Sequence, residues 1–163
     1  MPAIQLITEH DKSLREHLLY LLQGGGAHIS FDDFVADFPA ELCDRKIESL
    51  PYSAWQVLEH MRIAQWDILE FCRNAKHVSP DWPEGYWPRK DERGNAEGWK
   101  QSVEAFQRDL KQIEELIADR STDLFARIPH GDSQTILRET LLVADHNAYH
   151  LGVLVAISRI LKK

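Results

Sequence analysis

Residues 141–152 read Leu-Leu-Val-Ala-Asp-His-Asn-Ala-Tyr-His-Leu-Gly, and this stretch decides the fold that we expect. It is apolar on nearly every side of a helix, which predicts the most buried helix of an all-α protein. This helix should begin near Asp132 or Ser133 and run to about Leu161. Its carboxylate and imidazole side chains argue against a membrane span.

Three further long segments carry apolar residues at three- and four-residue spacing, which is typical of amphipathic helices. They run from about Ile4 to Gln23, from about Ser53 to Asn74 and from about Glu97 to Asp119. Gly24-Gly25-Gly26 ends the first helix. A short helix from Phe31 to Phe38, with Ser30 as its N-cap, interrupts the long connection that follows. The pattern predicts one domain, residues 1–163, folded as an antiparallel four-helix bundle with a long connection between helices one and two.

Composition narrows the classes of function. The formal net charge is −7, and no basic run is longer than Lys162-Lys163, so we expect no nucleic-acid partner. Two cysteines, Cys43 and Cys72, are too few for a disulfide scaffold and favour a reducing compartment. The N-terminal residues lack the pattern of a signal peptide. We therefore expect a cytoplasmic protein with no membrane partner.

Two histidines on the last helix are spaced for metal binding. His146 and His150 are four residues apart, so their side chains lie on one face, with Cβ atoms roughly 5–6 Å apart. His60 lies at the edge of the apolar stripe of the second long helix and supplies a third ligand if the two helices are neighbours. Three imidazole ligands leave a coordination position open, which is the pattern of catalytic rather than structural zinc. The prediction is one divalent ion on His60, His146 and His150.

The alternative is that these histidines are hydrogen-bonded core residues without a metal. Burying two imidazoles among leucines and valines costs free energy unless both are satisfied, and a shared cation would satisfy them. Two known metal patterns are excluded. Asn147 stands where a zincin needs the glutamate of His-Glu-x-x-His, and the chain lacks the Glu-x-x-His pairs of di-iron bundles.

Other polar residues have weaker claims. Glu59 or Asp67 could orient an imidazole from behind, although a solvated carboxylate is the simpler interpretation. His10 and His17 fit a solvated helix edge, and His130 fits a turn. The aromatic loop from Trp82 to Trp87 is a candidate wall for an apolar substrate, with a role in packing alone as the stronger alternative.

Three stretches resemble the DinB-like (YfiT-like) superfamily of metal-dependent proteins. They are Leu50–His60 (LPYSAWQVLEH), Ala144–Gly152 (ADHNAYHLG) and Pro83–Pro88 (PEGYWP). The resemblance spans nearly the whole chain. It implies a four-helix bundle, commonly a homodimer, whose zinc or nickel ion is held by histidines at the positions of His60, His146 and His150. Val153 stands where many members carry glutamine, a departure that leaves the three histidines in place.

The resemblance does not fix one activity, because branches of the superfamily resemble thiol-dependent transferases or hydrolases. We expect a metal-dependent enzyme of the thiol S-transferase or hydrolase type, acting on a low-molecular-weight thiol or another small-molecule substrate. The ion would lower the pKa of a bound thiol or water. The alternative is a non-enzymatic, dimeric, metal-stabilised bundle that serves in binding or in a stress response.

Overall fold

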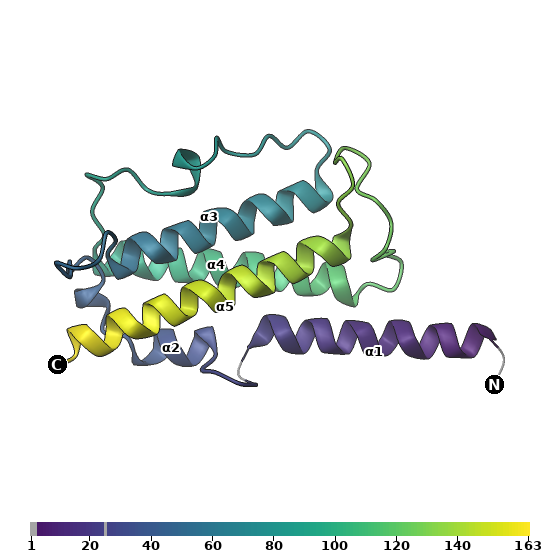
Figure 1. Cartoon of the computed structure of the whole chain (residues 1–163), viewed down its shortest axis with the longest axis horizontal. Coiled ribbons are helices and arrows are strands. Elements are labelled where there is room, and N and C mark those ends of the chain that lie inside the picture. Colours follow the sequence, from purple (N-terminus) through teal and green to yellow (C-terminus); the bar gives the residue numbers. More distant parts are fainter. Residues whose placement is uncertain (1–2, 25) are drawn as a thin grey trace.

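The computed structural model describes residues 3–24 and 26–163, and Figure 1 shows the course of the chain. The described residues form α-helices and two short 3-10 turns and contain no strand beyond one isolated bridge, so the expected all-α class is confirmed. The helices are α1 (Ala3–Gln23), α2 (Phe31–Asp37), α3 (Ala54–Arg73), α4 (Ala96–Ala118) and α5 (Ile136–Leu161), with the 3-10 turns η1 (Ala40–Leu42) and η2 (Glu84–Tyr86).

The long helices pack in a definite set of pairs. α3 contacts both α4 and α5, and α1 also contacts α4 and α5. In Figure 1, α1 and α2 follow one another along the same edge of the molecule, beneath α5. The long connection after α1 therefore contributes to the core, because it contains α2, which covers the half of the bundle that α1 does not reach.

The core is divided in the same way. One cluster joins α2 to α3, α4 and the end of α5, and its aromatic contacts include Phe31 with Phe106 (ring centroids 4.2 Å apart) and Phe38 with Trp99 (4.7 Å). The other cluster joins α1 to the opposite halves of the same helices through Leu18, Leu22, Leu69, Ile113 and Val143. Apolar residues at helical spacing explain both clusters, because each amphipathic face is buried against its neighbours.

Helix starts follow from side-chain caps. Ser30 caps α2, as the sequence predicts, and Ser53 forms a capping box with Gln56 at α3. Gly24, with φ of 69°, follows the end of α1, while Gly25 of the predicted glycine stop lies outside the described residues. The predicted loop around Trp82 to Trp87 is confirmed, apart from the short turn η2.

The predicted start of the last helix is wrong by three to four residues. α5 begins at Ile136 with Thr135 as its N-cap, rather than near Asp132 or Ser133. The preceding segment is held extended, because the backbone N–H of Ile128 donates to the carbonyl of Gln134 (2.8 Å) and Arg127 forms a bridge with Thr135. These hydrogen bonds between residues on either side of the turn compete with an earlier start of the helix.

α5 is also the one described helix that is long and apolar enough to cross a membrane by length and composition. A core helix of a bundle meets the same criterion. α5 packs against α3 and α1 and carries the buried side chains of Glu139 and Thr140, which fit a protein interior better than a lipid surface.

A buried arginine joins α1 to the end of α4. The Arg15 guanidinium donates to the carbonyls of Ile117 (2.6 Å), Asp119 (3.1 Å) and Thr122 (2.7 Å). It also pairs with the Asp11 carboxylate at 2.8 Å. Carbonyls at the C-terminal end of a helix have no partner within the helix, so Arg15 supplies one.

We expect Arg15→Met to lower the free energy of unfolding by about 2–3 kcal/mol, because buried carbonyls lose charged hydrogen-bond donors. Urea denaturation followed by circular dichroism measures the change. Lys12→Met is the matched control, since Lys12 lies on the same helix and is exposed. Equal stability of the two variants would contradict this role of Arg15.

Candidate metal centre

The structure brings together the three histidines that the sequence singles out. His60 comes from the middle of α3, and His146 and His150 come from successive turns of α5. The Nε2 atoms of His60 and His146 are 3.1 Å apart, and one ring nitrogen from each of the three residues lies within 4.8 Å of the others. Two nitrogens bound tetrahedrally to zinc are roughly 3.3 Å apart, given bonds of about 2.0–2.1 Å. The spacing therefore suits a shared ion.

The position of the proton on His60 also suits a metal. Its Nδ1 lies 2.8 Å from the backbone carbonyl of Tyr86, which can only accept a hydrogen bond. Nδ1 must therefore carry the proton, which leaves the lone pair of Nε2 directed toward His146. A backbone carbonyl behind a histidine is a common way to set the tautomer of a metal ligand.

Burial keeps the three rings neutral, as metal ligation requires. Desolvation lowers the pKa of His60, although the hydrogen bond to Tyr86 opposes the shift. Desolvation, followed by the charge of His60, lowers the pKa of His146 to about 4. The pKa of His150 is also lowered to about 4, by desolvation and then by the charges of His146 and His60. Three neutral nitrogen donors at this spacing fit a borderline-soft ion such as zinc or nickel.

The protein offers these three donors, and two of them remain partly accessible to solvent. Within the described residues, the cluster contains no carboxylate and no thiol. His60 is buried, whereas His146 and His150 are only half-buried on α5. A site with three protein ligands and partial exposure has room for a further, non-protein ligand.

An aromatic stack covers His60. The ring of Trp87 lies parallel to the His60 imidazole, with centroids 3.9 Å apart and planes 1° apart. Tyr52 stacks on Trp87 at a centroid distance of 4.0 Å. Trp87 is thus part of the wall of the site, while Trp82, at the other end of the predicted aromatic loop, is 76% exposed. The loop divides into a part that packs on the site and a part that faces solvent.

A second group of residues anchors this loop and was only partly foreseen. The buried carboxylate of Asp67 accepts a hydrogen bond from the Tyr86 hydroxyl (2.7 Å) and contacts His77 Nε2 (2.7 Å). Asp67 therefore affects His60 only indirectly. It holds Tyr86 in place, and the carbonyl of Tyr86 orients the His60 imidazole. Sequence reasoning missed Tyr86 and His77 because the first acts through its backbone and the second lies in a loop. The run Pro-Glu-Gly-Tyr-Trp-Pro was the only available signal.

Other predicted candidates lie apart from the cluster. Glu59 pairs with Arg62 at 2.8 Å, so it does not orient His60. Asn147 is the exception, since it is adjacent to His146 in the sequence and interacts with it, and its amide also donates to Gln65 Oε1 (2.8 Å). His10 and His17 are exposed on α1, as expected, and His130 bonds to the Phe71 carbonyl next to the turn before α5.

Burial disfavours the thiolate form of both cysteines. Cys43 is buried rather than exposed in its loop, and desolvation raises its pKa. Desolvation, with a smaller contribution from the charge of Glu139, raises the pKa of Cys72 to about 12.

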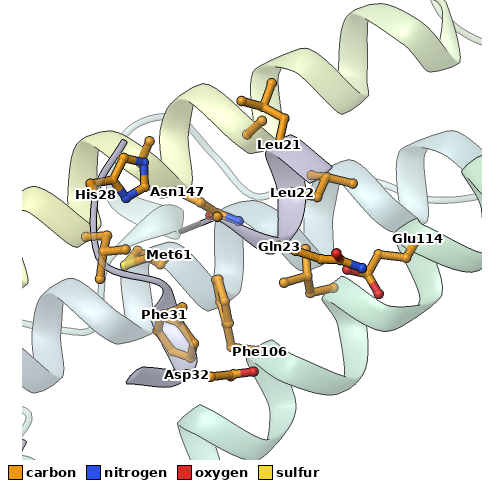
Figure 2. Close-up of a pocket in the computed structure, with 15 residues that line it drawn as sticks. Leu21, Leu22, Gln23, His28, Phe31, Asp32, Met61, Phe106, Glu114 and Asn147 are labelled. Carbon is orange, nitrogen blue, oxygen red and sulfur yellow. The ribbon is translucent and has the colours of Figure 1, made fainter. Parts of the chain in front are cut away.

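The cavity in Figure 2 is a separate feature. It measures about 110 Å³ and lies between the end of α1, α2, α4 and α5, where its labelled lining residues include Leu22, Phe31, Phe106, Glu114 and Asn147. None of the three clustered histidines lines it. Ligand pockets usually measure about 300–1,000 Å³, so this cavity is too small to hold a typical substrate.

Comparison with known families agrees with this geometry. The family model of the DinB superfamily matches residues 29–154, which is more than half of the chain and includes all three histidines. Searches of curated proteins and of solved structures gave no match.

Metal content tests the site directly. Purified protein loaded with zinc and dialysed should hold about one ion per chain, and His146→Ala or His150→Ala should lose most of it, because each removes one of only three donors. Elemental analysis provides the readout. His17→Ala is the matched control, since His17 is exposed on α1. Full metal content in both α5 variants would exclude the site.

The lowered histidine pKa values predict a pH dependence of stability in metal-free protein. The unfolded chain protonates His146 and His150 near pH 6.5, whereas the folded chain does so near pH 4. The unfolded state therefore binds more protons between these values, and stability should fall as the pH drops from 6.5 toward 4. Urea denaturation in the presence of chelator measures the fall. The double variant His146→Gln, His150→Gln should show a shallower dependence, and an identical slope would refute the assignment.

Proposed function

The chain belongs to the DinB superfamily, and we propose that it is a metal-dependent enzyme of the thiol S-transferase or hydrolase type. The observation that carries the proposal is the partly exposed cluster of His60, His146 and His150, which provides three imidazole donors. The ion, zinc or nickel in this proposal, supplies Lewis acidity that lowers the pKa of a thiol or water.

The surrounding residues hold the donors and shield them. The Tyr86 carbonyl keeps the His60 proton on Nδ1, so that Nε2 is free to bind the ion. Trp87 covers one face of the His60 ring and excludes water there. Helical spacing fixes His146 and His150 relative to each other, and α3–α5 packing fixes both relative to His60. Such positioning lowers the cost of reorganisation when a substrate arrives.

The nucleophile in this proposal comes from outside the chain. Both cysteines are buried or partly buried and have raised pKa values, so the protein offers no thiolate of its own. A low-molecular-weight thiol or a water molecule is then the partner that the open side would receive. The exposed ring of Tyr149, which contacts His150 edge-on at 4.9 Å, borders this approach.

The remaining parts of the proposal follow the resemblance. We propose an antiparallel course for the four long helices, in keeping with the observed pairs of packed helices. We also propose a cytoplasmic homodimer, and the exposed apolar side chains of α5 support a contact with a second copy. These are Leu141, Leu142, Tyr149 and Ile160.

Activity assays with generic substrates test the enzyme. We expect zinc- or nickel-loaded protein to accelerate either the reaction of 1-chloro-2,4-dinitrobenzene with cysteine or glutathione, or the hydrolysis of p-nitrophenyl acetate. Chelation should return the rate to background, and added metal should restore it, because the Lewis acid is lost and regained.

His150→Ala should be inactive, and His17→Ala, an exposed histidine on α1, should behave as the unmodified protein. A rate that survives chelation would contradict the proposal. If the loaded protein shows no activity with either substrate class while chelation still lowers its melting temperature, the result would favour the metal-stabilised bundle without enzymatic activity.

A further inference from the structure

A large pocket lies beside the aromatic stack of the metal centre. Its volume is about 800 Å³, and its lining includes Tyr52 and Trp87. This volume falls within the range of about 300–1,000 Å³ that is common for small-molecule sites. Gln56, which also lines it, precedes His60 by one helical turn on α3, so the pocket and the histidine cluster are neighbours along that helix.

The charges around the pocket are unusual for this chain. Lys46, Arg89 and Lys90 line it, with Glu84 as the one acidic residue among the lining side chains. The excess of positive charge contrasts with the formal net charge of −7 for the whole chain. All three basic residues are exposed, and within the described residues none of their side chains forms an ion pair, whereas nearby Arg93 pairs with Asp44. Unpaired cations around a concave surface attract an anion.

The uncharged residues that line the pocket indicate that the ligand also has an apolar or aromatic part. Tyr52 and Trp87 stack with ring planes 15° apart, and Pro51, Pro83 and Pro88 form further apolar surface. Aromatic side chains contribute large apolar contact areas and prefer to pack against other rings. Stacking on His60 holds Trp87 in place, so this wall is formed before a ligand arrives. Preformed, mostly apolar walls with a few polar groups are typical of small-molecule sites.

We infer that this pocket binds a small aromatic or apolar anion, with its ring against Tyr52 and Trp87 and its negative charge near Lys46, Arg89 and Lys90. Trp87 is shared by the pocket and the metal centre, so such a molecule would lie next to the histidine cluster. The inference that this anion is the substrate rests on the proposed function. The inference that the pocket binds such an anion does not, because no histidine of the cluster lines the pocket.

The test uses 2-naphthoate, its neutral analogue 2-naphthamide and inorganic phosphate as probes for isothermal titration calorimetry. The full chain is titrated after chelation, at an ionic strength of about 0.01 M so that surface charges are weakly screened. We expect 2-naphthoate to bind roughly ten-fold more tightly than either 2-naphthamide, which lacks the charge, or phosphate, which lacks the ring. Equal affinity for 2-naphthoate and either of the other probes would overturn the assignment.

Variants locate the site. Replacing the three cations together (K46Q, R89Q and K90Q) should remove the preference for the carboxylate over the amide, and Lys12→Gln, on distant α1, should leave it unchanged. Circular dichroism verifies that the triple variant folds. A preference that survives the triple substitution, or 2-naphthoate binding that requires the loaded metal, would contradict the pocket. If metal-free protein binds 2-naphthoate but the metal-loaded protein shows no activity in the assays above, the proposed function is refuted and the pocket is sustained.

Discussion

The contact between α3 and α5 is the constraint on which the candidate site depends. His146 and His150 are placed on one face by helical geometry alone, but His60 reaches them only because the two helices pack directly against each other. The same packing partly desolvates the three rings, which lowers their pKa values and favours neutral donors before an ion binds. Burial of the apolar faces of α3 and α5 thus both stabilises the fold and prepares the three histidines to bind a metal ion.

The long loop between α3 and α4 completes the site rather than merely joining two helices. It is attached at Asp67 through the hydroxyl of Tyr86, at His60 through the Tyr86 carbonyl, and again at His60 through the ring of Trp87. These contacts explain how a proline-rich segment of this length is ordered. The two interpretations of the aromatic loop, packing and a wall for a ligand, are compatible, because Trp87 packs on the imidazole and also faces the neighbouring pocket.

Local patterns in the sequence were enough to predict the long helices and the pair of His146 and His150, whereas the role of His60 depended on which helices are neighbours. Apolar spacing identified the long helices, and the four-residue spacing of His146 and His150 required no tertiary information. The start of α5 was predicted too early, because two contacts across the preceding turn hold that segment extended. They join Ile128 to Gln134 and Arg127 to Thr135. The role of Tyr86 could not be predicted either, because every residue type has a backbone carbonyl and the sequence does not show which one contacts His60.

The central claim is that three histidines hold the ion and the protein leaves the rest of its coordination sphere open. X-ray absorption spectroscopy of the zinc-loaded protein tests this most directly, because imidazole scattering and the number of nearest neighbours are both measured. We predict three imidazole nitrogens near 2.0–2.1 Å together with at least one exchangeable oxygen ligand, replaced by sulfur when a small thiol is added. Four protein ligands, or fewer than three imidazoles, would contradict the account.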